Sequence, residues 1–320
     1  MGFLSSLFSS SKKEDTSSEE KPKEDLKNFD ILKYDGIRAM QMRQVGYAIK
    51  CFQKALEIES DFETMNNLVN AYVLVGEPES ALGVIDEMFL IEPEHIQTLL
   101  ARVNILFHLD RDGDAVSTCD KAIELEPDNH IAWFLRAKAK RAIKNHAEAI
   151  EDVSQAITLK EDFADGFLLR SEIFLLMEEG EKALEDVNKV ISLVEEGEET
   201  AHLLRGRIYE LLGNEEDAAN EYREVLDLNP FNEQAYLLAG KLMVTRQKYD
   251  EAMAIYDEAL EHVESFAKAY VMRGKLKELT GDKEGAEEDL RMAAELEPEG
   301  GEEGKTGQAD FDNMYKGGLF

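Results

Sequence analysis

The stretch AYLLAGKLMVTRQKYDEAMAIYDEALEHV, residues 235–263, has the pattern of two helices joined by a short polar turn. In its second half, Ala252, Tyr256 and Ala259 follow at offsets of four and three residues, which places them on one face of an α-helix. In its first half, the bulky Tyr236 is followed four residues later by a glycine, where a small side chain lets a second helix cross closely. The stretch therefore predicts a helical hairpin.

The same pattern recurs along the chain. An alanine returns every 33 to 35 residues, and a small or medium residue follows it seven positions later. Four of the six prolines stand twelve residues after a marker alanine, where a proline ends one helix and starts the next. One hairpin cannot cover both of its apolar faces, so eight copies predict a stack with a continuous core. The marker alanines are Ala48, Ala81, Ala115, Ala149, Ala183, Ala218, Ala252 and Ala286.

A helix-turn-helix unit of about 34 residues with these columns resembles the tetratricopeptide repeat (TPR) family. The resemblance covers residues 29–298, with local departures at Ser60, Glu161, Glu195 and Glu264, which stand in place of the proline. It implies an all-α, right-handed superhelical solenoid of eight TPR units, in which the first helix of each unit lines a concave groove. It also implies a protein that binds other proteins.

The segments outside the repeats have a different composition. Residues 1–28 are predicted to be a disordered leader, and residues 299–320 a disordered tail rich in acidic residues and glycine. A short amphipathic segment in the leader predicts a weak membrane contact, and a leader without any membrane contact is the alternative. The apolar face of this segment consists of Phe3, Leu4, Leu7 and Phe8.

The charge balance restricts the partners. Asp and Glu outnumber Lys and Arg by 68 to 36, which gives a formal charge of −32. Binding to phosphates requires a basic surface, so a nucleic-acid partner is excluded. The two cysteines, Cys51 and Cys119, fall two repeats apart and are predicted to be buried free thiols. No secretory signal or membrane-spanning run is recognisable, so we expect a cytoplasmic protein, with a peripheral membrane position as the alternative.

Nothing in the pattern predicts catalysis. The six histidines are scattered, and no pair shares a helix face at metal-ligand spacing. A phosphate-binding glycine-rich loop and a nucleophile elbow are also missing from the sequence. We therefore expect no enzyme activity, no metal and no cofactor.

An arginine column has a structural interpretation. Five repeats carry an arginine thirteen residues before the marker alanine, and in four of them a carboxylate follows sixteen residues later. The three repeats without the arginine have Cys51, Val84 and Ile255 at the carboxylate position. Joint presence and joint absence predict an ion pair within each hairpin. Arg102 precedes Thr118 and lacks an acid, so it is the member freest for another role. The predicted pairs are Arg136–Asp152, Arg170–Asp186, Arg205–Glu221 and Arg273–Asp289.

By family geometry, a second set of residues faces the groove. From the fourth repeat onward, an apolar lane runs beside four basic residues and one acid, Glu172. In so acidic a chain this favours a partner segment that mixes apolar and acidic residues. The alternative is that the apolar residues pack between first helices and the lysines only solvate them. The candidate groove residues are Phe134, Lys138, Leu168, Leu203, Arg207, Leu237, Lys241, Val271 and Lys275.

The sequence thus predicts a scaffold or adaptor that binds a peptide or protein segment in its groove. The alternative function is a regulatory or structural subunit of a larger enzyme or membrane-associated complex, without a free peptide ligand. The fold serves many partners, so the sequence does not name one.

Overall fold

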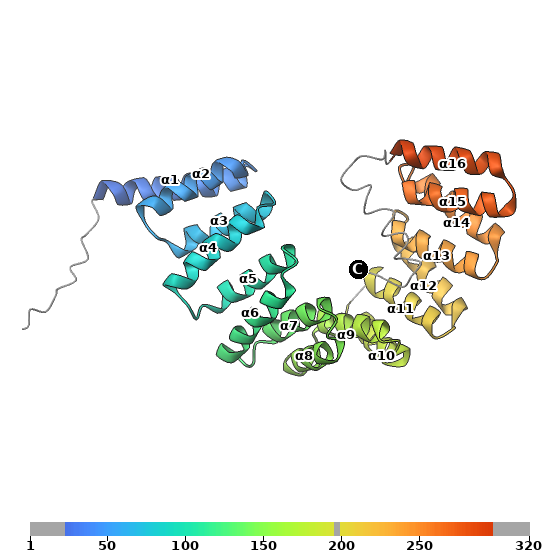
Figure 1. The fold of residues 1–320 in the computed structure, drawn as a ribbon, viewed down its shortest axis with the longest axis horizontal. Coiled ribbons are helices and arrows are strands. Elements are labelled where there is room, and N and C mark those ends of the chain that lie inside the picture. The colour runs from blue at the N-terminus through green and yellow to red at the C-terminus, as the bar shows by residue number, and fades with distance from the viewer. Residues whose placement is uncertain (1–22, 195–198, 297–320) are drawn as a thin grey trace, which may run out of the picture. The chain divides into compact units, whose positions relative to one another are not determined.

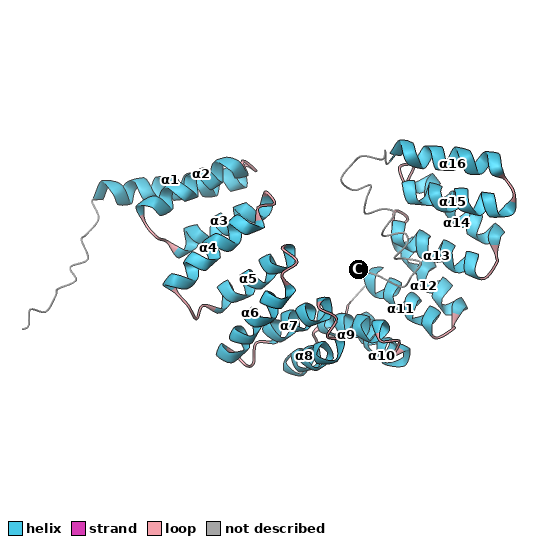
Figure 2. Ribbon diagram, in the orientation of Figure 1, coloured by secondary structure: helices cyan, strands magenta, loops and turns pink. Residues whose placement is uncertain are grey.

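A computed structural model describes residues 23–194 and 199–296, and these residues form sixteen α-helices and no strands (Figures 1 and 2). The first six helices are α1 (Lys23–Gln41), α2 (Val45–Ile58), α3 (Phe62–Leu74), α4 (Pro78–Ile91), α5 (Ile96–His108) and α6 (Asp112–Leu125). The next six are α7 (His130–Ala142), α8 (His146–Leu159), α9 (Ala164–Leu176), α10 (Gly180–Leu193), α11 (Glu199–Leu211) and α12 (Glu215–Leu228). The last four are α13 (Glu233–Thr245), α14 (Tyr249–His262), α15 (Ala267–Thr280) and α16 (Lys283–Leu296).

The helices form eight hairpins, as the 34-residue period predicts. Each odd-numbered helix packs most extensively against the even-numbered helix that follows it. The second helices α2, α4, α8, α10, α12 and α14 also pack against the first helix of the next hairpin. The first helix begins at Lys23, six residues before the boundary expected at residue 29. Glu24 and Asp25 lie in its first turn, where negative charge favours a helix N-terminus.

The packing divides the chain into two compact units, with the division between Glu126 and Pro127. The first unit contains α1–α6 and the second contains α7–α16. Within the second unit, α9 touches both α7 and α11, so first helices of successive hairpins adjoin one another. Figure 1 shows α7 and α9 on the inner side of this unit's curve and α8 and α10 on its outer side.

Small residues at the marker positions allow the close packing. All eight marker alanines are buried, and seven of them are completely inaccessible to solvent. Gly206 lies against the ring of Tyr222, and a Cβ atom at this glycine would approach Cε1 of the ring to 2.4 Å. Gly240 makes the same approach to Tyr256. The glycine of the first helix therefore leaves space for the large side chain of the second helix.

The turn inside each hairpin requires a left-handed residue. Gly76, Gly213 and Gly281 supply it with φ of 73°, 76° and 97°, because glycine adopts the left-handed conformation without strain. The other five hairpins use a non-glycine residue at the same place, with φ between 53° and 62°. These residues are Arg43, Asp110, Lys144, Glu178 and Gln247.

Two further features concern the buried thiols and the last hairpin. Cys51 and Cys119 are buried thiols that form no disulfide, as predicted. In α16, Glu287 and Ala294 are exposed at positions where the other repeats carry larger or apolar residues that face the next hairpin. The candidate membrane segment (Phe3, Leu4, Leu7 and Phe8) and the tail 299–320 lie outside the described residues.

Candidate functional site

The predicted arginine–carboxylate pairs are present in all four hairpins that carry both partners. Arg170 donates from Nε and Nη2 to the two carboxylate oxygens of Asp186, each at 2.7 Å. Arg136 and Arg273 bind their aspartates in the same bidentate way, at 2.7 to 2.9 Å. Arg205 pairs with Glu221 at 2.9 Å. The three aspartates are buried, so these pairs fasten the two helices of a hairpin in a largely desolvated place. The aspartates are Asp152, Asp186 and Asp289.

Three of these arginines also reach back to the second helix of the preceding hairpin. Arg273 binds Asp257 at 2.6 Å, Arg170 donates to the hydroxyl of Ser154 at 3.0 Å, and Arg205 donates to the amide oxygen of Asn188 at 3.0 Å. Each of these three arginines therefore bridges two second helices. We call this arrangement the arginine bridge.

Arg102 is part of the same arrangement despite its missing acid. It donates to Thr118 Oγ1 at 2.8 Å and contacts Asp86 at 3.4 Å. Its side chain is 23% exposed. The arginine bridge, with a hydroxyl in place of the carboxylate, accounts for Arg102, so the structure gives no support to a separate role.

The candidate groove residues all lie on first helices of the second unit, α7, α9, α11, α13 and α15. We call the side of these helices that bears them the first-helix face. Phe134, Leu168, Leu237 and Val271 are partly buried, and so are Lys138, Arg207 and Lys241. Lys275 is exposed. Leu203 differs from the rest: it is 7% exposed and belongs to the core cluster that contains Tyr222.

Charged groups connect successive first helices across this face. Arg141 of α7 forms an ion pair with Glu172 of α9, and the charge of Glu172 also acts on Arg207 of α11. Glu210 of α11 lies within electrostatic reach of both Arg207 and Lys241 of α13. From α7 to α13, the basic residues are thus interleaved with acids.

Burial changes the ionisation of this surface at α11. Loss of solvent lowers the pKa of Arg207 and raises the pKa of Glu210. Tyr222 of α12 donates a short hydrogen bond from its hydroxyl to Glu210 Oε1, and burial with the nearby Glu210 raises the pKa of the phenol. Arg207, Glu210 and the neutral phenol of Tyr222 therefore form a partly desolvated cluster at α11.

Sequence reasoning missed two members of this face. Arg141 and Glu210 both stand eight residues before a marker alanine, a position that the resemblance also directs toward the groove. Their position in the repeat was therefore sufficient to predict that both residues lie on this face. With these two residues the face holds five basic and three acidic side chains in repeats four to eight, including Glu278 of α15.

Two searches for other kinds of site gave negative results over residues 23–194 and 199–296. No group of three or more His, Cys, Asp or Glu side chains could hold a metal ion there. No helix in these ranges is long and apolar enough to cross a membrane.

Comparisons with known proteins agree with the repeat architecture. Two family models described as tetratricopeptide repeat match the chain, one over residues 199–232 and 267–299 and the other over residues 99–162. A search of curated protein sequences found no significant match.

Solved structures share the fold at low sequence identity. A tetratricopeptide repeat protein from Parabacteroides merdae superposes with a TM-score of 0.60 at 19% identity, covering 74% of this chain and 94% of that one. A chain of the APC/C hetero-tetramer Cut9-Hcn1 superposes with a TM-score of 0.54 at 15% identity, covering 80% of this chain and 50% of that one. The family-model matches identify tetratricopeptide repeats in residues 99–162, 199–232 and 267–299, and the likenesses to solved structures show the same repeat fold.

Proposed function

We propose that this protein is a non-catalytic interaction scaffold, and that its first-helix face binds a protein segment carrying apolar and acidic side chains. The observation that carries the proposal is an excess of positive charge on this face in a chain of net charge −32. Tetratricopeptide repeat proteins are generally non-catalytic scaffolds, which supports the first part of the proposal.

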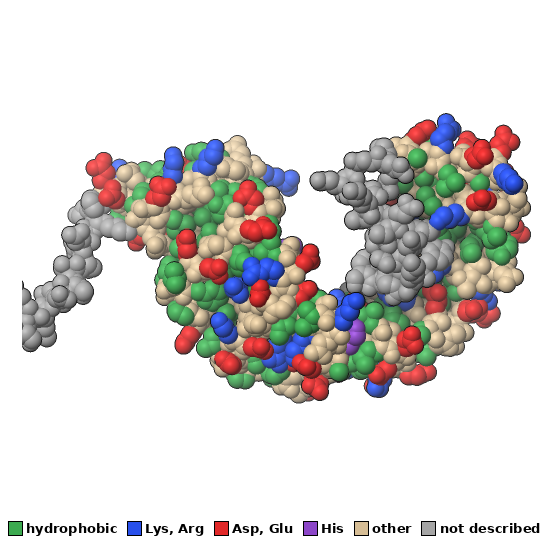
Figure 3. All heavy atoms as spheres, viewed as in Figure 1, with side chains coloured by type: hydrophobic (Ala, Val, Ile, Leu, Met, Phe, Trp, Pro, Cys, Tyr) green, Lys and Arg blue, Asp and Glu red, His purple; other side chains and the backbone are tan. Residues whose placement is uncertain are grey.

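The position of the basic residues supports an extended ligand. Lys138, Arg207, Lys241 and Lys275 lie on four different first helices, so one ligand would cross several hairpins to meet them all. Solenoids use such extended surfaces for binding. Figure 3 shows, in contrast, acidic side chains spread over the visible face of both units.

Fewer apolar residues are accessible on this face than the sequence predicts. Leu203 is buried in the core and contributes packing, while Phe134, Leu168, Leu237 and Val271 retain part of their surface. Phe134 packs edge-on against Phe163 at 5.1 Å between ring centroids, which fixes its orientation. A ligand would therefore meet apolar patches separated by charged groups, and its own side chains would have to match that alternation.

Charge reversal at the C-terminal end of the face tests the proposal. Lys241→Glu with Lys275→Glu removes two favourable contacts and adds two repulsive ones, so the affinity should fall by about tenfold at low salt. Lys121→Glu with Lys189→Glu is the matched control, because both lysines are exposed on second helices and the charge change is the same. The readout is fluorescence anisotropy with short labelled peptides that mix Leu or Phe with Asp and Glu.

The effect of salt separates a charge contact from a folding defect. The difference between the wild type and the Lys241/Lys275 variant should shrink as salt rises, since screening weakens surface charge contacts. Equal binding by both proteins at low salt would contradict the proposal. Stable co-purification with one stoichiometric enzyme, unaffected by the variant, would instead favour the subunit alternative.

A further inference from the structure

The arginine bridge fills a defined space between successive second helices. In the last hairpin, Arg273 of α15 extends between Asp257 of α14 and Asp289 of α16, at 2.6 Å and 2.7 to 2.9 Å. Its side chain is 19% exposed. The aliphatic part and the guanidinium of the arginine thereby close the gap between the two second helices and the first helix beneath them.

The seventh repeat lacks this filling. Ala239 stands at the arginine position of α13, and Ile255 stands at the carboxylate position of α14. At the place of the backward acceptor, α12 carries Arg223, which pairs with Glu258 of α14 at 2.9 and 3.1 Å. The helices α12 and α14 are therefore connected by the exposed Arg223–Glu258 ion pair, and the arginine position between them holds only the methyl group of Ala239.

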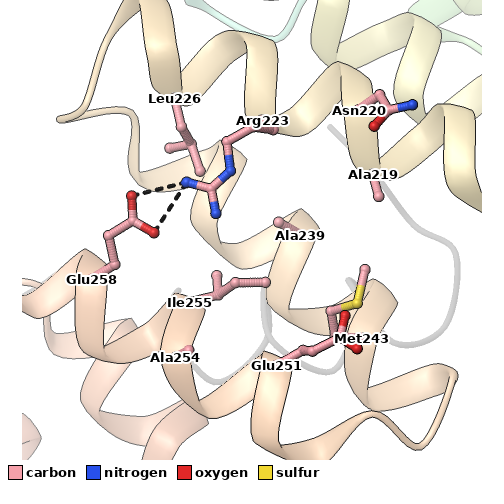
Figure 4. Close-up of a pocket in the computed structure, with 10 residues that line it drawn as sticks. All are labelled: Ala219, Asn220, Arg223, Leu226, Ala239, Met243, Glu251, Ala254, Ile255 and Glu258. Atoms are coloured by element: carbon pink, nitrogen blue, oxygen red, sulfur yellow. Dashed lines mark hydrogen bonds and ion pairs between the residues drawn. The ribbon is translucent and has the colours of Figure 1, made fainter.

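A pocket of about 390 Å³ lies at this position (Figure 4). Leu226, Ala239 and Met243 are its buried lining residues, each no more than 6% exposed. Three more apolar residues, Ala219, Ala254 and Ile255, come from the two second helices. The polar lining residues are Asn220, Arg223, Glu251 and Glu258. This volume lies within the range of small-ligand and side-chain pockets, about 300–1,000 Å³.

The second repeat also lacks the arginine, but it carries larger side chains at the corresponding positions. In the second repeat, Leu68 replaces the arginine and Tyr72 stands one turn later. Leu68 is buried, and the hydroxyl of Tyr72 accepts a hydrogen bond of 2.8 Å from Gln53 Nε2 of the preceding second helix. Larger side chains therefore lie at that interface. In the seventh repeat the corresponding residues are Ala239 and Met243, which leave the space open.

The helices around the pocket are strongly acidic. Between them, α12 and α14 carry eleven Asp and Glu residues, and Arg223 is their only Lys or Arg. Nine of these acids are exposed; Glu251 lines the pocket, and Glu258 engages its one cation, Arg223. Three of the nine already pair with cations of the protein: Glu215 with Arg246, Glu251 with Lys248 and Asp257 with Arg273. The exposed acids are Glu215, Glu216, Asp217, Glu224, Asp227, Asp250, Glu251, Asp257 and Glu261.

We propose that this pocket is a second docking site, which receives one large apolar side chain from a partner segment with flanking Lys or Arg residues. It goes beyond the proposed function because it uses second helices and a ligand of opposite charge. The apolar anchor buries the lining of Leu226, Ala239 and Met243, and the basic flanks meet the acidic surfaces of α12 and α14. Buried anchors of this kind dominate the affinity of interfaces, with charged rims supplying orientation.

The protein's own arginine bridge provides the test variant. Ala239→Arg with Ile255→Asp places in the seventh repeat the pair that Arg273 and Asp289 form in the eighth. It fills the pocket without changing the net charge. The probe is a short labelled peptide with one central Phe between Lys residues, and its partner peptide has Ala in place of the Phe.

Wild-type full-length protein should bind the Phe peptide about tenfold more tightly than the Ala peptide, since one anchor is lost. The filled variant should lose this difference and keep the residual, salt-sensitive attraction to the basic flanks. Equal binding of the two peptides by the wild type, or an undiminished preference in the filled variant, would overturn the proposal. So would tighter binding of a peptide in which Glu replaces every flanking Lys.

Two measurements keep the result distinct from misfolding and from the first-helix face. The filled variant should retain the helical circular dichroism of the wild type, and Ala239→Leu is a second filling variant if it does not. Lys241→Glu with Lys275→Glu should leave the preference for Phe intact, so the two sites fail separately. The methyl NMR signal of Met243, assigned through Met243→Leu, should shift on adding the Phe peptide, and an unmoved signal places the peptide elsewhere.

Discussion

Removal of the Asp186 carboxylate tests whether the arginine bridge is structural. Asp186 accepts two hydrogen bonds of 2.7 Å from Arg170, and the side chains are 5% and 21% exposed. In Asp186→Ala the guanidinium keeps only Ser154, at 3.0 Å, as an acceptor. Breaking a buried pair by removing one partner typically costs 3–5 kcal/mol. Because Arg170 retains some access to water, we expect the lower end, about 3 kcal/mol.

The assay is urea unfolding followed by circular dichroism, with Glu151→Ala on the exposed side of α8 as the control. The free energy of unfolding should fall in Asp186→Ala and change little in the control. The double variant Arg170→Met with Asp186→Leu should recover most of the loss, because it leaves no unpaired buried charge. An unchanged midpoint in Asp186→Ala, or a double variant as unstable as the sum of its two single variants, would refute the structural interpretation.

Three further outcomes follow from individual side chains. Glu178→Gly should raise stability by roughly 0.5–1 kcal/mol in thermal unfolding, since Glu178 has a φ of 60° that glycine adopts without strain; a loss would show that its side chain matters more. Tyr236→Phe should leave stability unchanged or slightly higher, because the buried hydroxyl of Tyr236 has no hydrogen-bond partner, whereas Tyr222→Phe should cost about 1–3 kcal/mol through the loss of its bond to a buried carboxylate. Burial would raise the pKa of Asp289, but hydrogen bonds from Arg273 and Lys277 outweigh it and hold the pKa below its usual value. The stability that this depressed pKa confers is therefore present above about pH 4 and lost as pH falls, so the difference from Asp289→Asn should shrink in acid denaturation series, and a pH-independent difference would contradict the linkage.

The columns of the sequence predicted the hairpins because a residue's phase on a helix decides whether it is buried. The marker alanines and the glycine beside Tyr222 lie where two helices cross, and only small side chains fit there. The pairing of Arg170 with Asp186 was predictable for a related reason: a buried charge requires its partner, so the two appear in the same repeats.

Other features depend on contacts between neighbouring hairpins and on local packing. The residue type at one repeat position does not predict these contacts. Arg170 also bonds to Ser154 of the preceding hairpin, and the residues at this backward position vary in chemistry from repeat to repeat. The burial of Leu203, beside the half-buried Leu237 at the same phase, depends on the local packing of α11. The pocket beside Ala239 depends on three residues of the seventh repeat together: Ala239 at the arginine position, Ile255 at the carboxylate position and Met243 one turn after Ala239. None of the three residues alone predicts a pocket.

The pocket at Ala239 also indicates how a repeat protein can change one binding property without changing the others. Deleting a large side chain from the single core of a globular protein leaves a closed void that all the surrounding elements share. Here each hairpin touches only its neighbours, so the space opens outward and the arginine bridge of the eighth repeat keeps its geometry. A repeat protein can thus gain a binding pocket when a small side chain replaces a large one in a single repeat. Neither an inserted loop nor a shift in the register of the stack is needed.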